Sequence, residues 1–188
     1  MMSTEKELLK QYSKKTVPML KNKLTKILVI FFLLVINVGC DQITKSIVRR
    51  NVEYNQQIDV IEGFILLTRV ENTGAFLGMG DNLPRLLYTI FMIILPLIVL
   101  VYAIYYLFAS EKLSRLFTLG ICLFIGGGFG NVIDRIVYGS VTDFLRFDFI
   151  LFHTGIVNMA DISITAGFFL ILFEMIINQK NLRLKLSD

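Results

Sequence analysis

Tryptophan is absent from this chain of 188 residues, histidine occurs once and cysteine occurs twice. The single histidine, His153, argues against a histidine-based metal site and a serine–histidine triad, and we expect it to be an ordinary loop residue. The two cysteines, Cys40 and Cys122, lack the spacing of metal ligands and do not suggest a disulfide framework. The sequence also has no internal repeats and no low-complexity linkers.

Apolar residues, in contrast, are abundant: they make up 55% of the chain, and the mean hydropathy is +0.66. Soluble domains are usually about 45–50% apolar, and the excess here is concentrated in blocks. The 16 phenylalanines and 7 tyrosines suit lipid-facing and interfacial surfaces, where tryptophan is the more usual anchor. The net charge of +4 does not indicate nucleic-acid binding, because the basic residues cluster in the tails and short loops. Membrane orientation explains their positions better.

Blocks of apolar residues predict helices that cross a membrane. A helix needs about 20 residues, at about 1.5 Å each, to cross a hydrocarbon layer of about 30 Å. The predicted spans are residues 27–48, 86–108, 116–132 and 162–178. Asn82 ahead of Pro84 indicates the start of the second helix, and Pro96 predicts a kink within it. The expected fold is therefore an all-α membrane protein, a four-helix transmembrane bundle.

The basic residues predict the orientation of this bundle. The tail of residues 1–26 holds seven lysines against two acids, and the turn at 110–115 and the tail at 179–188 are also basic. An even number of spans places both termini and this turn on one side, which the positive-inside rule makes cytoplasmic. The segments at 49–84 and 133–160 are then extracytoplasmic.

Within the first outer segment, residues 64–71 have the composition of a β-strand. Their partial alternation places Arg69 and Glu71 on one face, and the turn string Glu71-Asn-Thr-Gly-Ala-Phe76 follows. We expect a small extracytoplasmic sheet here, resting at the membrane surface.

The first span also resembles a lipoprotein signal sequence that ends before Cys40. A basic region, an apolar region and the small residue Gly39 precede this cysteine. Against cleavage, Asn37 stands where a small or aliphatic residue is expected, and three further spans follow. We expect the span to be retained, with Cys40 facing a neighbouring helix.

Two aspartates, Asp143 and Asp161, lie at the edges of apolar runs towards the end of the chain. Carboxylates near a hydrocarbon layer are costly, so they are rarely without function. If the two face each other across the bundle, they can share a proton and activate water for amide hydrolysis.

Other polar residues are weaker signals when each is taken alone. Asp41 pairs with Lys45 at a spacing of four, and Lys45 is long enough to reach the interface. The glycines before Asn131 are typical of close helix packing. Asp134 and Arg135 either anchor the helix at the interface, or Arg135 binds a carboxylate in bidentate fashion.

Five strings, taken in order and spacing, identify a family. They are Asp41-Gln-Ile-Thr-Lys45, Glu71-Asn-Thr-Gly-Ala-Phe76, Gly130-Asn-Val-Ile-Asp-Arg135, Val141-Thr-Asp-Phe144 and Asn158-Met-Ala-Asp161. The set resembles lipoprotein signal peptidase, also called signal peptidase II, over residues 24–178. The departures are Val157, where the family usually has an aromatic residue, and a longer N-terminal tail.

The resemblance implies an aspartic endopeptidase of the bacterial cytoplasmic (inner) membrane, with residues 27–178 as its four-span domain. Members cut prolipoproteins before a diacylglyceryl-modified cysteine, work without a metal or organic cofactor, and are blocked by the antibiotic globomycin. The family's fold includes an extracytoplasmic β-cradle, which agrees with the expected sheet. Its catalytic pair maps onto Asp143 and Asp161. Its supporting residues map onto Asp41, Asn72, Gly74, Asn131, Arg135 and Asn158.

Two rival functions follow from the residues themselves. A proton-coupled transporter would place acids near the span centres, whereas these acids lie at span ends on one side. A lipoprotein anchored through Cys40 would be the substrate class instead of the enzyme. A mass measurement distinguishes this lipoprotein from the enzyme, because the enzyme retains residues 1–39 and carries no lipid on Cys40.

Overall fold

The computed structural model describes residues 23–74, 83–110, 113–149 and 153–186, with side chains up to residue 179. Its helices are α2 (Lys23–Asn51), α3 (Arg85–Tyr88), the π-helix η2 (Thr89–Ile94), α4 (Leu95–Ala109), α5 (Arg115–Val137) and α6 (Met159–Leu186). Its strands are β1 (Ile58–Ile61), β2 (Ile65–Asn72) and β3 (Val141–Phe147). Several predicted features lie outside the described residues: most of the basic tail, Asn82, the end of the turn string at Phe76 and part of the basic turn.

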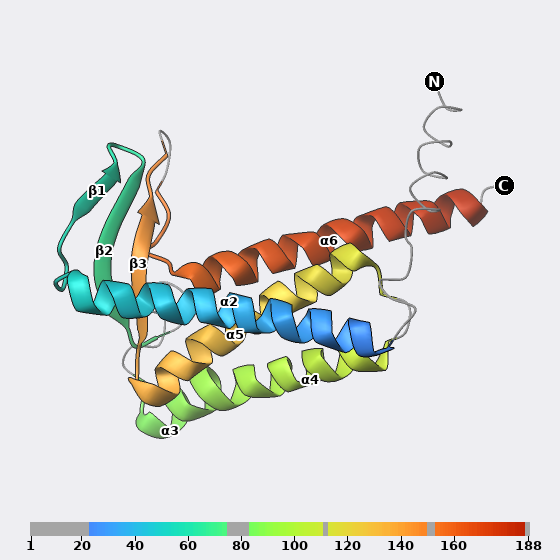
Figure 1. Cartoon of the computed structure of the whole chain (residues 1–188), viewed down its shortest axis with the longest axis horizontal. Helices are drawn as coiled ribbons and strands as arrows, with labels where there is room; N and C mark the ends of the chain where they lie inside the picture. The colour runs from blue at the N-terminus through green and yellow to red at the C-terminus, as the bar shows by residue number, and fades with distance from the viewer. Residues whose placement is uncertain (1–22, 75–82, 111–112, 150–152, 187–188) are drawn as a thin grey trace.

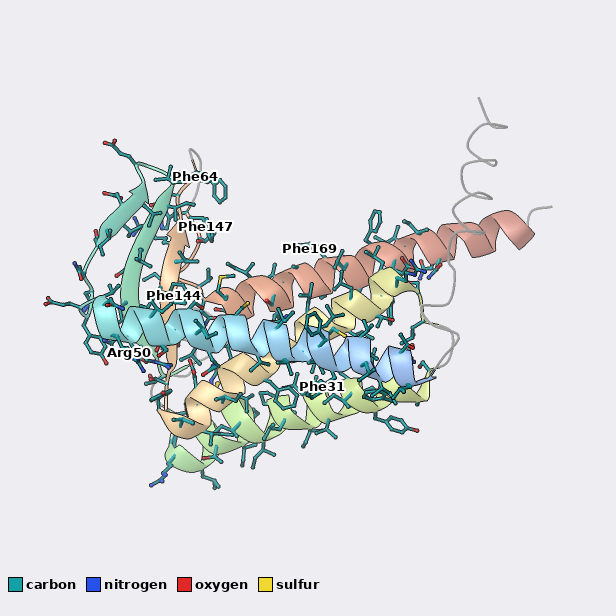
Figure 2. The ribbon with its side chains drawn as sticks, in the orientation of Figure 1. Phe31, Arg50, Phe64, Phe144, Phe147 and Phe169 are labelled. Carbon is teal, nitrogen blue, oxygen red and sulfur yellow. The ribbon has the colours of Figure 1, made fainter. Side chains whose placement is uncertain are left out.

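Four helical stretches are long and apolar enough to cross a membrane, which confirms the predicted four-helix bundle. They cover Leu24–Asn51, Arg85–Ala109, Arg115–Val137 and Met159–Gln179. Three of the four, all but Arg115–Val137, bury few of their residues and present large apolar side chains on their outer faces. Phe31 on α2 and Phe169 on α6, labelled in Figure 2, are 66% and 60% exposed. Such surfaces are suited to lipid.

Helix α5 is the buried centre of this bundle, and its glycines explain how closely the other helices approach it. A Cβ added at Gly128 would lie 2.5 Å from Leu100 of α4, and one at Gly126 would lie 2.7 Å from Asn37 of α2. At Gly127 it would collide with the carbonyl oxygen of Ala160 on α6. The prediction of close packing through these glycines is therefore confirmed.

The second span, in which the sequence predicts a kink at Pro96, is a continuous helix with an irregular stretch directly before this proline. Six residues of π-helix, Thr89–Ile94, precede α4, and Pro96 lies in the first turn of α4. Proline lacks the N–H that an α-helix requires, and the wider π turns accommodate this loss before the regular helix resumes.

The sheet has the order β1-β2-β3 with antiparallel pairing. Strand β2 confirms the strand predicted at 64–71, and the Arg69 Nε lies 3.6 Å from Glu71 Oε1 on one face. The sequence did not predict β3, which contains the string around Asp143. Pairing of β2 with β3 is irregular between Leu67 and Val70, so that Val70 lies opposite Asp143.

The sheet lies at the end of the bundle where α2 ends and α6 begins (Figure 1). The start of α2 and the described end of α6 lie at the opposite end of the bundle. Val48, Val52 and Phe144 form a small buried cluster that packs the sheet onto the helices. This junction positions the polar residues described below.

Cys40 does not face a neighbouring helix, so this expectation is wrong. The side chain is exposed, and α2 continues without a break through it. The inward stripe of α2 consists instead of Asn37, Asp41 and Lys45, which recur every four residues and are buried. Cys40 is about 100° away from this stripe around the helix.

Candidate active site

Asp143 and Asp161 come from different elements and meet at the junction of sheet and bundle. Asp143 lies in β3 and is 4% exposed, and Asp161 lies in the first turn of α6. Burial, followed by the negative charge of Asp161, raises the pKa of Asp143 to about 6, against the opposing effect of two hydrogen bonds. The structure therefore brings together the two carboxyls that the sequence singled out.

Asn158 connects both carboxyls at the start of α6. Its side-chain Nδ2 donates to Asp143 Oδ1 at 2.6 Å. Its backbone N–H donates to Asp161 Oδ2 at 3.1 Å, while the Asp161 N–H donates to Asn158 Oδ1 at 3.0 Å. This reciprocal pattern is a capping box, which satisfies the free N–H groups of the first helical turn. The same local sequence therefore starts the helix and places Asp161.

Two further asparagines donate to the remaining carboxyl oxygens. Asn72 Nδ2 donates to Asp143 Oδ2 at 2.9 Å, and Asn131 Nδ2 donates to Asp161 Oδ1 at 2.8 Å. Asn72 also accepts from the Gly74 N–H at 3.0 Å, which fixes the turn after β2. Each of the four carboxyl oxygens thus accepts a hydrogen bond from an uncharged donor.

Among the described residues, Arg135 hydrogen-bonds carbonyl oxygens and no carboxylate, so the expected bidentate contact with one of the described carboxylates is wrong. Its Nη2 donates to the carbonyl oxygen of Gly74 at 3.0 Å, and its Nη1 lies 3.5 Å from the carbonyl oxygen of Asn131. Its buried Nε has no hydrogen-bond partner in the part of the chain that the structure describes. The guanidinium therefore braces the turn that holds Asn72, beside the two aspartates.

A buried charge cluster supports the site from α2 and α5. Lys45 Nζ lies 2.8 Å from Asp41 Oδ2 and 3.2 Å from Asp134 Oδ2, and Asp134 also pairs with Arg49 at 2.8 Å. The predicted Asp41–Lys45 pair is confirmed. The expectation that Lys45 extends to the interface is wrong, because its side chain is fully buried. Asp134 is likewise buried and paired, not an interfacial anchor with Arg135.

Asp41 connects this cluster to α6. Its Oδ1 accepts from the backbone N–H of Ala160 at 2.9 Å, so a side chain of α2 caps a different helix. A Cβ at Gly130 would collide with Asp41 Oδ2, and this glycine therefore permits the close approach.

The site also includes Lys45, Arg49 and Thr142, which were not among the site residues predicted from the sequence. Arg49 Nε donates to Thr142 Oγ1 at 2.7 Å, and Thr142 is the residue before Asp143 in β3. The spacing of four residues from Asn37 through Asp41 to Lys45 is the signal that indicates a buried polar stripe. Within the described residues, no group of three or more His, Cys, Asp or Glu side chains could hold a metal ion.

Comparison with known proteins shows what this arrangement is similar to. The family model described as signal peptidase (SPase) II matches residues 30–177. The lipoprotein signal peptidase of Enterococcus faecalis is 33% identical over 158 residues, which cover 84% of this chain and 94% of that protein. The Listeria monocytogenes lipoprotein signal peptidase is 32% identical over 143 residues, covering 76% and 90%.

Solved structures agree with this result. A bacterial membrane enzyme determined by the in meso method at 2.3 Å resolution superposes with a TM-score of 0.70 at 29% identity. The match covers 84% of this chain and 90% of that one. A second bacterial membrane enzyme, determined at 1.9 Å, gives a TM-score of 0.64 at 27% identity, covering 80% and 92%.

Proposed function

The chain belongs to the signal peptidase II family, and from this premise we propose that Asp143 and Asp161 are the catalytic pair of an aspartic endopeptidase. The protein is a multi-pass membrane protease that removes signal peptides from prolipoproteins during lipoprotein maturation. The observation that carries the proposed pair is the convergence of two carboxyls from β3 and α6 on one set of asparagine donors.

The proposed reaction uses one proton shared by the pair. Two neighbouring carboxyls cannot both ionise cheaply, so one stays protonated near neutral pH. The ionised carboxylate takes a proton from water, and the water oxygen attacks the scissile carbonyl carbon. The protonated carboxyl donates to the developing oxyanion. When the tetrahedral intermediate collapses, one of its hydroxyl groups returns a proton to the ionised carboxylate and the C–N bond breaks. The departing amine takes up the proton of the other carboxyl, so the pair again holds one proton.

The choice of asparagine as donor supports this chemistry. An Arg or Lys hydrogen-bonded to each carboxyl would hold both of them ionised and would leave no acid. Uncharged amide N–H groups fix the orientation of the carboxyls with a weaker effect on their protonation. The pKa of about 6 for Asp143, raised mainly by burial, is suited to proton transfer near neutral pH.

We place the active site at the extracytoplasmic face, with both termini in the cytoplasm. The pair lies at the end of the bundle that carries the sheet, whereas the start of α2 and the end of α6 lie at the other end. These two helix ends adjoin the basic tails of the sequence, which the positive-inside rule assigns to the cytoplasm. A prolipoprotein then keeps its apolar signal helix and acyl chains in the bilayer, and only the cleavage site reaches the polar residues around Asp143 and Asp161. The cut is proposed to fall directly before the diacylglyceryl-modified cysteine, and globomycin is the proposed inhibitor.

Cleavage of a defined substrate tests these proposals. The purified enzyme is incubated with a diacylglyceryl-modified prolipoprotein and, in parallel, with the unmodified precursor, and the products are identified by mass. We expect a product that begins at the lipidated cysteine, little cleavage of the unmodified precursor, and inhibition by globomycin. A different cut position, or equal cleavage of both precursors, would overturn the proposed specificity. Full activity in excess globomycin would overturn the proposed inhibition.

A further inference from the structure

We propose that Lys45 is a positioning residue of the active site, whose buried ammonium group fixes the orientation of the Asn131 amide and thereby the hydrogen bond from Asn131 to Asp161. The inference rests on the proposed role of Asp161 and adds a residue outside the proposed set of supporting residues. Lys45 acts through Asn131, because its side chain is fully buried and has no surface on which a substrate can bind.

The contacts of Lys45 use the full capacity of an ammonium group. Its Nζ lies 2.8 Å from Asp41 Oδ2, 2.9 Å from Asn131 Oδ1 and 3.2 Å from Asp134 Oδ2. An ammonium group has three N–H donors and no acceptor, so the three oxygen partners match it. Of these partners only Asn131 is uncharged, and only Asn131 continues to a proposed catalytic carboxyl.

An asparagine side chain has two chemically different ends, and this makes the contact directional. Because the ammonium only donates, the oxygen of the Asn131 amide must face Lys45, and the NH₂ group then faces Asp161 Oδ1 at 2.8 Å. A rotated amide would place its NH₂ group against the ammonium and its oxygen against a carboxyl. Asn158 Nδ2 also donates to Asn131 Oδ1, at 3.2 Å. The Lys45 contact is shorter and charge-assisted, so it dominates the orientation.

The charges around Lys45 balance within the cluster. Asp41 on α2 and Asp134 on α5 contact the ammonium, and Arg49 pairs with Asp134 as a second base. The remaining charged groups that face it are Asp143 on β3, whose carboxylate the Lys45 charge favours, and Asp161 on α6, beyond Asn131. With two acids and two bases in the cluster, a lysine is tolerated at a depth where an unpaired one would be expelled.

Replacement of Lys45 by methionine removes the donor and keeps most of the side-chain length. For Lys45→Met we expect kcat to fall about 10–100-fold, by analogy with the loss on removing partners that orient metal ligands. KM should stay within about twofold, because the substrate does not touch this position. The acidic limb of the pH–rate profile should move to higher pH, since a positive charge that favours ionised Asp143 is lost. The matched control is Lys26→Met, which removes a lysine bonded to the Ser110 carbonyl at the other end of α2 and should leave kcat and the pH profile unchanged.

A charge-balanced variant separates positioning from stability. Lys45→Met leaves the cluster with one acid in excess and lowers the melting temperature, whereas Asp41→Asn with Lys45→Met removes one charge of each sign. We expect the melting temperature of this double variant to recover. Its kcat should remain as low as that of Lys45→Met and should lie below the kcat of the Asp41→Asn single variant. Recovery of the kcat of Asp41→Asn, or an unchanged kcat in Lys45→Met, would overturn the positioning role. Neither result affects the proposed pair, which fails only if Asp143→Asn or Asp161→Asn remains active.

Discussion

Burial and hydrogen bonding have opposite effects on the pKa of Asp143. Burial and the neighbouring Asp161 raise its pKa to about 6, while the donors Asn72 and Asn158 favour the ionised form. Because the ordinary pKa is 3.8, the unfolded chain releases this proton earlier than the folded enzyme does as the pH rises. The folded state therefore loses relative stability between about pH 4 and 6, a cost borne at a site whose proton is needed for catalysis.

The proposed pair leads to a first prediction at this scale. Asp143→Asn and Asp161→Asn preserve side-chain shape but remove the ability to exchange a proton, so each should lower cleavage by at least about 10²–10⁴-fold. Folding should be retained, as measured by thermal unfolding of the purified protein. Asp148→Asn is the control, because Asp148 is partly exposed and its one ion pair among the described residues is with Arg146 at 2.9 Å. Near-normal cleavage by either catalytic variant, in a preparation free of host enzyme, would refute the pair.

A second prediction concerns the donor Asn72. Its hydrogen bond lowers the pKa of Asp143, so Asn72→Ala should raise that pKa further above 6 and move the corresponding limb of the kcat/KM profile to higher pH. The profile is measured on purified enzyme from pH 4 to 9. Asn51→Ala serves as the control, because Asn51 is exposed and its side chain donates to the Ile47 carbonyl of its own helix, away from the two aspartates. A limb that stays in place or moves down would show that Asn72 does not set the protonation of Asp143.

Among the elements, α2 has the most varied role, because one helix both faces lipid and carries the polar stripe that joins α5 to α6. Asp41 is the point of contact with α6. Asp41→Ala should remove the cap at Ala160 and leave Lys45 with one carboxylate fewer, at a cost of up to about 3–5 kcal/mol. We expect a lower melting temperature and lower activity with little change in the pH profile. A large shift of the pH profile at normal stability would contradict this structural role.

Packing of α5 against α6 allows a matched glycine pair to be compared. Gly127→Ala places a Cβ against the backbone oxygen of Ala160, which cannot move without displacing the start of α6 and Asp161. Gly39→Ala, in α2, meets nothing within 4 Å and should be neutral or stabilising by up to about 1 kcal/mol. Melting temperature and cleavage rate should therefore fall only for Gly127→Ala. Equal behaviour of the two variants would show that the α5–α6 distance is not limiting.

For the whole molecule, the orientation in the membrane is the property to be tested. Single cysteines are placed at Asn55, beside the sheet, and at Gln179, at the other end of α6, in a background with both native cysteines replaced. A membrane-impermeant maleimide added to intact cells should label the cysteine at position 55 but not the one at 179, because the basic turn and tails predict a cytoplasmic side. Labelling after cell lysis controls for reactivity. The reverse pattern would defeat the proposed topology.

The sequence by itself determined the bundle and much of the site. Long apolar blocks have to form helices in a membrane, since every backbone group must be bonded within the segment, and this fixed the four spans independently of their partners. Strand β2 and the Asp41–Lys45 pair were also predictable, because alternation and a spacing of four are local properties. Family strings singled out Asp143 and Asp161.

Only the tertiary structure decided how the polar residues connect. Strand β3 pairs with β2 across a long sequence separation, because Val141 lies opposite Asn72, 69 residues earlier. No local pattern encodes such a partner. The position of Lys45 was also decided by tertiary structure. Its sequence neighbours predict that it extends to the interface, but three oxygens from α2 and α5 bind its ammonium group inside the bundle. Arg135 likewise bonds the Gly74 carbonyl instead of a carboxylate. A buried charge takes the partners that packing brings within reach, and these are known only when the helices and the sheet are in place.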